Sequence, residues 1–339
     1  MNDMKKTIVS TLAFIVLFQC FTFGQGSRYC GPYIEHKPVI WKDVHDKIIS
    51  KLSITNPLGH CIQLINCSNI TIHNCKLGPS KNEGVYLNNC SNITVKDCSM
   101  DSIDSGVVAD VCTGIKVSYN DVRNVQGPLP RGQMVQFGHV SGPGNVISYN
   151  VGENIPGQSN PEDEISLYMS NGTDEDPIRV IGNWIRGGGP STSGGGIMTG
   201  DKGGSYVLVE DNILVNPGQY GITISSGNHI TIKNNKIYSK MLPFSNIGLS
   251  AYKQYPIETF LNTIMNNEVN FTNKKGSLNC MWNAGNCGEV TGWKTNFYNA
   301  DLKASILPQK IIGRCQGASE KIKTKQIKTK HKRKSIRKN

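Results

Sequence analysis

Four side chains in the middle of this 339-residue chain have types that suit proton transfer and charge neutralisation. They are His139, Tyr168, Asp201 and Lys202. When a uronic acid undergoes β-elimination or epimerisation, a base removes the C5 proton while a cation neutralises the carboxylate. His139 or Tyr168 could act as base or acid, and Lys202 could supply the positive charge. These residue types favour lyase- or epimerase-type chemistry, provided that the fold brings them together.

Glycoside hydrolysis is the second chemistry considered, with Asp163, Glu164 and Asp201 as its candidate carboxylates. A glycosidase needs two carboxyl groups roughly 5 to 9.5 Å apart. Glu164 and Asp201 differ by one turn of the coil described below and by five positions along the strand, which predicts a separation above about 10 Å. Lyase chemistry is therefore favoured over hydrolysis. Four residues are expected to bind substrate: Gln133, Gln136, Asp163 and Arg186.

A repeated pattern indicates how these residues are positioned. It reads apolar, any, apolar, any, any, Asn or Cys, any, apolar, as in Ile70-Ile72-Cys75-Leu77 and Ile178-Val180-Asn183-Ile185. The second apolar position falls at residues 49, 72, 95, 117, 147, 180, 209, 232 and 264, with a basic step of 22 to 23 residues. A fixed short period predicts one unit stacked about nine times, as a wide coil of parallel strands.

Each repeat also contains a second short strand with alternating apolar residues, which faces inward and outward in turn. If Val135, Ile165, Ile197 and Ile222 are equivalent inward positions, the neighbouring residues form columns. The expected columns are Gln136, Ser166, Met198 and Thr223, then Gly138, Tyr168 and Gly200, then His139, Met169 and Asp201. Glu164, one position before Ile165, is expected to point outward. Insertions lengthen these middle repeats, and insertions on a solenoid often form its binding face.

Asparagine and cysteine recur at equivalent turns and predict an internal ladder. The asparagine column contains Asn120, Asn150, Asn183, Asn212, Asn235 and Asn267, preceded by Cys75 and Cys98. Each amide can bond the next turn, as in stacked asparagine ladders. Cys67, Cys90 and Cys112 form a second column, where buried thiols would act as small apolar side chains.

These repeats resemble those of the right-handed parallel β-helix proteins, the pectate-lyase-like superfold. The resemblance covers about residues 48–269 and implies an all-β, right-handed solenoid. It implies little about activity. The Asn-Thr-Asp, Asp-Asp, Gly-His-Gly and Arg-Ile-Lys set of polygalacturonase-like members is not found in order. A pectate-lyase-like calcium triad with a catalytic arginine is not evident either, so no catalytic residue is transferred from the family.

The two ends of the chain differ from the repeats. Residues 1–24 combine Lys5 and Lys6 with an apolar run and predict a secretory signal peptide, hence a secreted, cell-surface or periplasmic protein. Residues 25–47 and 270–318 are expected to cap the coil, because an open end would be an exposed edge. Residues 319–339 form a basic tail, and the last twenty residues contain ten Lys or Arg and one acid. Such a tail is expected to be disordered and could contact a membrane or another anionic surface.

An exported chain can form disulfides. A Cys280–Cys287 bridge is the favoured pairing in the C-terminal cap. Cys30 and Cys315 are expected at opposite ends of the rod and therefore unpaired with each other. No cofactor is expected, although the oxygen-rich segment 171–176 could hold Ca²⁺ if it is more than a solvated acidic loop.

The sequence thus predicts an exported monomer whose partner is a complex, acidic polysaccharide and not nucleic acid. The alternative is a non-catalytic carbohydrate-binding or cell-surface β-helix. Five of the candidate residues also have a structural interpretation: Tyr168 as a surface aromatic, His139 and Asp201 as turn residues, and the Asp163-Glu164 pair as a loop cap.

Overall fold

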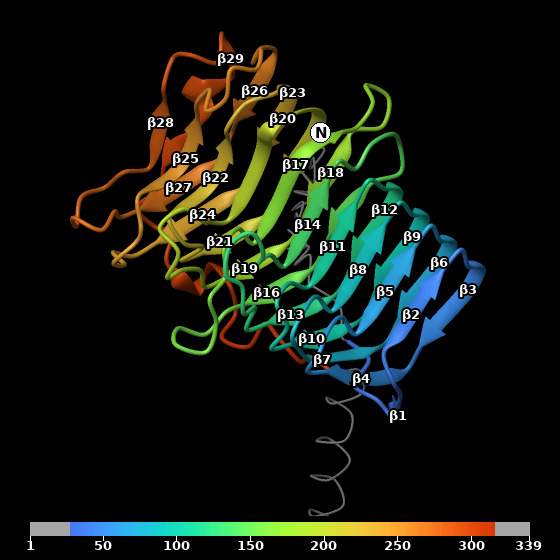
Figure 1. Ribbon diagram of the computed structural model, residues 1–339. Coiled ribbons are helices and arrows are strands. Elements are labelled where there is room, and N and C mark those ends of the chain that lie inside the picture. Colours follow the sequence, from blue (N-terminus) through green and yellow to red (C-terminus); the bar gives the residue numbers. More distant parts are fainter. Residues whose placement is uncertain (1–27, 316–339) are drawn as a thin grey trace, which may run out of the picture.

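The computed structural model describes residues 28–315, which form a coil of parallel strands arranged in three sheets (Figure 1). The expected signal segment and basic tail lie outside these residues. The first sheet contains β2 (Val39–Lys42), β5 (Ile62–Ile65), β8 (Val85–Asn88), β11 (Val107–Asp110), β14 (Val135–Gly138), β17 (Ile165–Asn171), β20 (Ile197–Glu210), β22 (Tyr220–Ile224), β25 (Ile247–Ala251) and β28 (Met281–Asn283). The all-β class and the stacked parallel architecture predicted from the repeats are confirmed.

The other two sheets complete each turn. The second sheet contains β3 (His45–Ser50), β6 (Ser68–His73), β9 (Ser91–Lys96), β12 (Thr113–Ser118), β15 (Val146–Ser148), β18 (Ile178–Ile181), the last part of β20, β23 (Asn228–Lys233), β26 (Asn262–Met265) and β29 (Val290–Thr291). The third sheet contains β1 (Ile34–Glu35), β4 (Leu52–Asn56), β7 (Lys76–Ser80), β10 (Ser99–Asp101), β13 (Asp121–Arg123), β16 (Val151–Glu153), β19 (Trp184–Arg186), β21 (Ile213–Val215), β24 (Lys236–Ser239), β27 (Glu268–Phe271) and β30 (Phe297–Tyr298). Because β20 pairs with β17 and then with β18, it joins the first and second sheets.

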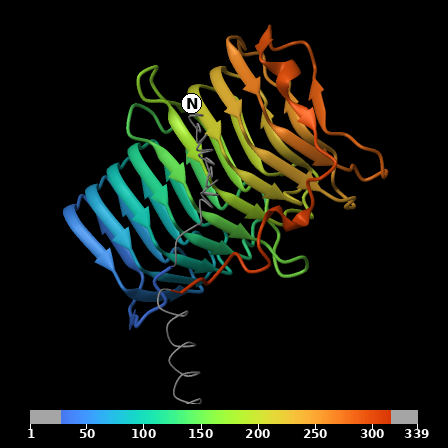
Figure 2. The ribbon, with the colours of Figure 1, turned by 180° about the vertical axis from the view of Figure 1, so that it is seen from behind.

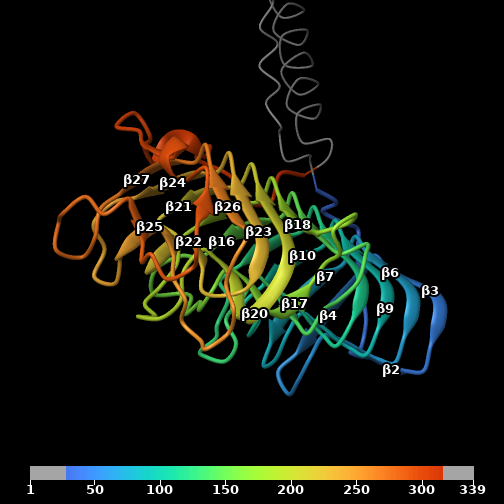
Figure 3. The same ribbon diagram turned by 90° about the horizontal axis from the view of Figure 1, so that it is seen from above.

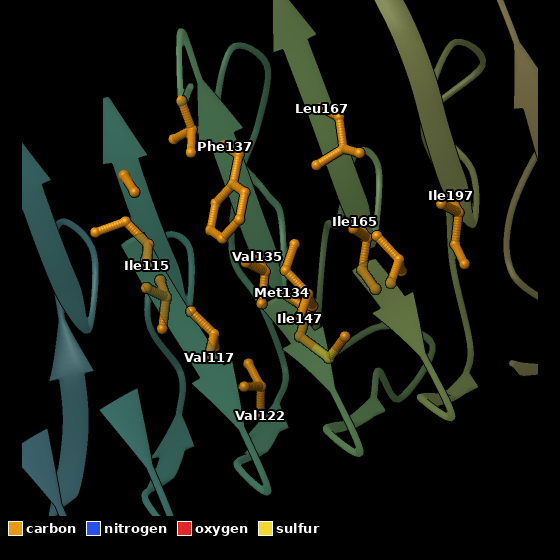
Figure 4. Packing of buried hydrophobic residues seen from close by; sticks show 14 of the residues in the cluster. Ile115, Val117, Val122, Met134, Val135, Phe137, Ile147, Ile165, Leu167 and Ile197 are labelled. Atoms are coloured by element: carbon orange, nitrogen blue, oxygen red, sulfur yellow. The ribbon is translucent and has the colours of Figure 1, made fainter. Parts of the chain in front are cut away.

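The alternating apolar residues of each strand point into the coil and stack on those of the next turn. Phe137 and Leu167 are fully buried and come from successive strands of the first sheet (Figure 4). Ile115 and Val117 enter the same core from the second sheet. Burial of large aliphatic and aromatic side chains contributes about 1.5–3 kcal/mol each, so this continuous core is the main source of stability.

The asparagine ladder is confirmed. Asn120, Asn150, Asn183, Asn212, Asn235 and Asn267 are all buried, and each side-chain amide donates to the carboxamide oxygen of the next turn. That oxygen also accepts the backbone N–H of the preceding asparagine, as in the 2.9 Å bond from Asn183 N to Asn212 Oδ1. The ladder continues to Asn296, which accepts from Asn267 Nδ2 at 2.7 Å. From Asn150 to Asn296, each carboxamide oxygen of the ladder therefore satisfies two buried donors of the preceding turn.

The cysteine columns are confirmed as free buried thiols: Cys67, Cys75, Cys90, Cys98 and Cys112. The expected Cys280–Cys287 bridge is wrong, since both cysteines are free.

The disulfide instead joins Cys30 to Cys315, contrary to the expectation that they lie at opposite ends. The coil first extends past residue 269, since β28, β29 and β30 pair with β25, β26 and β27. η1 (Trp293–Thr295) lies between β29 and β30, and η2 (Ala304–Ile306) follows β30. The chain then returns along the outside of the third sheet (Figure 2). Leu307 and Ile311 of this return segment pack on Val151 and Val215. Arg28 pairs with Cys315 there, so the ends of the described chain meet beside the middle of the coil.

Viewed from above, successive turns follow one another along the rod (Figure 3). No helix within residues 28–315 is long and apolar enough to cross a membrane.

A bulge in β20 changes the predicted register of the middle turns. Val135, Ile165, Ile197 and Ile222 are equivalent, as predicted, and so are Gln136, Ser166, Met198 and Thr223. After Met198 the pairing shifts, and Tyr168 pairs with Asp201 rather than Gly200. Gly200 has φ +65° at this point, where a Cβ would meet the Ser226 carbonyl oxygen. Glycine thus permits the extra residue, which is how β-bulges are commonly formed.

Candidate functional site

A cleft with a volume of about 730 Å³ lies on the outer face of the first sheet, over the middle turns. Its floor contains Gln136, Ser166 and Met198, which are in register on β14, β17 and β20. One wall is made by the segments that precede these strands, and the other by the strand ends and the turn after β25. The lining includes Asp110, Arg131, Gln133, His139, Glu162, Asp163, Tyr168, Ser193, Asp201, Gln219, Tyr252, Gln254 and Tyr255.

Asp163 is a buried carboxyl group at the edge of this cleft, only 8% exposed. Its Oδ1 accepts a short hydrogen bond from the Tyr220 hydroxyl and a 3.1 Å bond from the Gly195 N–H. Burial raises the pKa of Asp163 to about 7, although these two hydrogen bonds favour the charged form; the nearby carboxylate Glu162 adds to the rise. A carboxyl with this pKa holds a proton in a large share of molecules at neutral pH.

Asp201 faces the same cleft from the next turn of the coil. The Tyr255 hydroxyl donates a 3.0 Å hydrogen bond to its Oδ1. Burial raises the pKa of Asp201, while the hydrogen bond from Tyr255 and the charge of Lys202 oppose the rise. Asp201 also contributes to the raised pKa of Asp163, so the two carboxyl groups influence each other across the cleft.

His139 and Tyr168 lie together, as the register predicted. Their rings make an edge-to-face contact with centroids 5.4 Å apart. His139 Nδ1 lies 3.1 Å from Asp110 Oδ1, so one ring nitrogen is engaged by a carboxylate. The Lys202 ammonium lies 6.0 Å from the centre of the Tyr168 ring, outside the cleft lining. His139 and Lys202 occupy equivalent turns, and both have φ 53°. The predicted alignment of Asp201 with His139 is therefore wrong by one residue.

The predicted amide residues lie at the cleft and are held in place. Arg131 donates from Nη1 to Gln136 Oε1 at 2.9 Å and from Nε to Glu83 Oε1 at 2.7 Å. Gln136 therefore presents its NH₂ group as a donor. Gln133 is buried, with its Oε1 3.3 Å from the Ser105 hydroxyl. Arg131 is the one Lys or Arg among the lining residues of the described chain, and Glu83 pairs with it.

Glu164 does not point outward, as the alternation had suggested. Its side chain is fully buried inside the coil, where Asn154 Nδ2 donates to Oε1 at 2.7 Å. A Cβ on Gly152 would lie 3.5 Å from Oε2, which places the carboxyl against the third sheet. Glu164 lies at the corner just before β17. Glycines occupy the equivalent corner before β11, at Gly106, and before β20, at Gly196. Burial holds the pKa of Glu164 well above its ordinary value, so this residue is neutral and structural.

Arg186 lies on β19 of the third sheet, away from the cleft lining. It donates to Glu153 Oε1 at 3.1 Å and to the Gln309 carbonyl at 2.9 Å, and so anchors the return segment. In the segment considered for Ca²⁺, Asp176 is engaged by Arg179 and by the Gly144 N–H. Within the described range 28–315, no group of three or more His, Cys, Asp or Glu is placed to hold a metal ion.

Several cleft residues were missed by the sequence interpretation. Asp110 ends β11 and pairs with Gly138, so the repeat register alone could have found it. Tyr252 and Tyr255 follow β25, beyond the lengthened middle repeats. Tyr220 and Glu162 carried no signal, because their importance depends on which buried groups they contact.

The chain matches the family described as "right handed beta helix region" over residues 39–299. It belongs to this right-handed β-helix family. The match fixes the hand of the coil, as the sequence resemblance implied. No curated protein sequence matches the chain.

Solved structures with a similar fold differ widely from this right-handed β-helix in sequence. One is the catalytic domain of a GH87 α-1,3-glucanase in complex with nigerose, with 11% identity and a TM-score of 0.45, covering 77% of this chain and 49% of that one. Another is a tailspike protein of E. coli bacteriophage HK620 in complex with a pentasaccharide, with 11% identity and a TM-score of 0.45, covering 79% of this chain and 60% of that one. A third is a mannuronic acid-specific polysaccharide family 6 lyase from human gut microbiota, with 8% identity and a TM-score of 0.33, covering 82% of this chain and 88% of that one. The chain spans about half the length of the glucanase domain, and these likenesses concern the fold alone.

Proposed function

We propose that this β-helix binds a polysaccharide along the first sheet and hydrolyses a glycosidic bond with Asp163 and Asp201. The observation that carries the proposal is the pair itself. Asp163, with a pKa raised to about 7, and Asp201, on the next turn, line one cleft, and each accepts a hydrogen bond from a tyrosine. Two carboxyl groups with different environments are the usual equipment for this reaction. Five positions along the strand separate Asp163 from Tyr168, the partner of Asp201, but the effect of the Asp201 charge on the pKa of Asp163 supports the proximity of the two side chains.

Asp163 is assigned as the general acid. Both of its hydrogen bonds reach Oδ1, so Oδ2 is the oxygen that carries the proton to the leaving group. Its pKa of about 7 keeps the proton available near neutral pH, and burial strengthens its interaction with the glycosidic oxygen.

Asp201 is assigned as the ionised partner, acting as nucleophile or as the base that activates water. The hydrogen bond from the Tyr255 hydroxyl and the positive charge of Lys202 favour its carboxylate form. It therefore loses its proton more readily than it would through burial alone. The configuration of the released sugar, followed by NMR, distinguishes the two roles because only a nucleophile retains it.

The lining suits sugar hydroxyls. Amide and hydroxyl groups of Gln136, Ser166 and Gln219 lie beside the aromatic rings of Tyr168 and Tyr255. The charges of the lining favour a neutral polymer over a uronate, because four carboxylate residues line the cleft and Arg131 is paired with Glu83. This reverses the preference that the residue types alone suggested.

β-elimination or epimerisation of an acidic polysaccharide is the second candidate. It is favoured by the contact of His139 with Tyr168 in the same cleft and by Lys202 beside that ring. The Asp110 carboxylate next to His139 would, however, repel a uronate there. Binding without catalysis is the outcome if neither reaction is found.

Incubation of the protein with neutral glucans and with uronate polymers tests the proposal. Hydrolysis releases reducing ends without the ultraviolet absorbance of unsaturated products, whereas elimination produces both. Asp163→Asn should lower kcat by roughly 10²–10⁴-fold, the usual contribution of a general acid, and Asp201→Asn should abolish turnover. Unsaturated products that form normally in both variants would exclude the carboxylate mechanism.

We also infer export through residues 1–24, action as a monomer, and contact of the basic tail with an anionic surface. The apolar run after Lys6 supports export and the charge of the tail supports the surface contact, and both segments lie outside the described residues. Secretion of the full chain with loss of its first residues, and salt-sensitive binding to anionic vesicles, test them.

A further inference from the structure

A second cavity of about 490 Å³ continues the cleft along the first sheet, toward the C-terminal end of the coil. It is lined by Gln219, Tyr220, Thr223, Asn246, Ile247, Ser250, Tyr252, Asn279 and Trp282. Gln219 and Tyr252 also line the first cleft, so the two cavities are adjacent parts of one surface. The proposed hydrolysis does not use this second cavity.

Trp282 dominates this cavity as an exposed aromatic platform. It lies on β28, is 50% exposed, and is in register with Ser250 on the preceding turn. Its ring centre lies 5.7 Å from that of Tyr252, at an interplanar angle of 32°. Two neighbouring aromatic rings on an open face offer apolar surface to the C–H face of a sugar ring.

Polar groups around the rings are held in fixed positions. Thr223 and Ser250 hydroxyls lie 2.7 Å apart in a row along the floor. Asn279 donates to the Asn246 carbonyl at 2.7 Å, which orients its amide at the rim. An apolar platform with a few oriented polar groups is the usual composition of a carbohydrate subsite.

We propose that this cavity is a distal subsite for one sugar unit of the polymer whose glycosidic bond lies at Asp163 and Asp201. The proposal rests on the function proposed above. Ser166, Met198, Thr223, Ser250 and Trp282 are successive partners in the first sheet. Four steps of roughly 4.8 Å place Trp282 about 19 Å from Ser166 along the rod.

The consequence concerns the class of substrate. A short oligosaccharide that fills the first cleft cannot reach Trp282, whereas a longer chain lying parallel to the rod contacts both cavities. The protein therefore selects an extended polymer and cleaves within it, because the lining reaches Asp110 on one side of the two aspartates and Trp282 on the other.

Binding measured in the Asp201→Asn background separates this proposal from catalysis. The probes are tri- and octasaccharides of α-1,3-glucan, β-1,3-glucan, polygalacturonate and polymannuronate, titrated by calorimetry. Trp282→Ala should weaken octasaccharide binding by about 10-fold, in line with the loss of one aromatic contact, and should leave trisaccharide binding unchanged. Trp282→Phe should recover part of the affinity.

Phe297→Ala is the matched control, because Phe297 is 48% exposed on β30 of the third sheet, on another face. It should leave the affinity for both lengths unchanged, and all three variants should keep the parent's melting temperature. Equal losses for short and long probes in Trp282→Ala, or no loss for either, would overturn the subsite. Failure of all probes to bind would overturn it as well. A length-dependent loss in a protein that cleaves no polymer would uphold the subsite and reject the hydrolase.

Discussion

Tyr220→Phe should move the basic limb of the pH–rate profile upward. The Tyr220 hydroxyl donates to Asp163, and this hydrogen bond stabilises the charged carboxylate, which burial otherwise disfavours. Phenylalanine has nearly the same shape and fits the same buried position, where Tyr220 is 4% exposed. Without the hydroxyl, Asp163 should hold its proton to higher pH and remain an active acid there.

The size of the shift follows from the hydrogen bond. A hydrogen bond to a charged group contributes about 1.5–3 kcal/mol, and one pKa unit corresponds to about 1.4 kcal/mol, so the shift should be roughly one to two units. The Gly195 N–H remains as a donor to Asp163 and limits the change. The pKa of Asp163 should thus rise from about 7 toward the weakly alkaline range.

The assay is the pH dependence of kcat/KM, which reports the groups of the free enzyme, supported by NMR titration of the Asp163 carboxyl carbon. Tyr255→Phe is the matched control: it removes the donor to Asp201 and should move the acidic limb upward instead. A basic limb that stays in place or moves down in Tyr220→Phe, with the melting temperature retained, would refute the assignment of Asp163 as the acid.

Three further predictions concern stability. Asn183→Ala should lower the free energy of unfolding by about 2–4 kcal/mol, because two buried donors that share its carboxamide oxygen lose their acceptor. The control Asn246→Ala, at an exposed asparagine, should change it by less than about 0.5 kcal/mol in the same denaturant titration. Replacing Cys30 and Cys315 by serine should lower the free energy of unfolding by about 2–5 kcal/mol, because the bridge closes a loop with a sequence separation of 285 residues. An unchanged melting temperature would contradict this prediction. Glu164 holds its proton more tightly in the folded chain than in the unfolded one, so the free energy of unfolding should fall as the pH rises above the ordinary pKa of 4.5. Glu164→Gln should remove that fall. Calorimetry should show the variant to be more stable than the wild type at alkaline pH, but not below pH 4.5.

The coil could be predicted from sequence because its determinants are local and periodic. Asn183 and Asn212 are 29 residues apart, yet each occupies the same place in its own repeat, so the sequence spacing identifies spatial neighbours. The Cys30–Cys315 bridge could not be found in this way. It depends on a non-repeating segment that turns back along the rod, and no period describes that path.

The candidate site was predicted only where the register is regular. Gln136, Tyr168 and His139 lie as the alternation suggested. Asp201 was displaced by a single extra residue, and Glu164 was turned inward at a corner where strand alternation does not apply. The raised pKa of Asp163 was not predictable either, because it comes from burial in the folded chain and from the nearby charges of Glu162 and Asp201, against which the hydrogen bonds from Tyr220 and Gly195 act.

The bulge at Gly200 has a consequence for how such a protein can change during evolution. One added residue brings Asp201 alongside Tyr168, while the turns before and after keep their pairing. A stacked coil can therefore acquire or relocate a reactive group through a single-codon insertion, and the disturbance stays within one layer. Deleting Gly200 would remove the extra residue and show whether Asp201 then loses its place beside Tyr168 while the rest of the scaffold is kept.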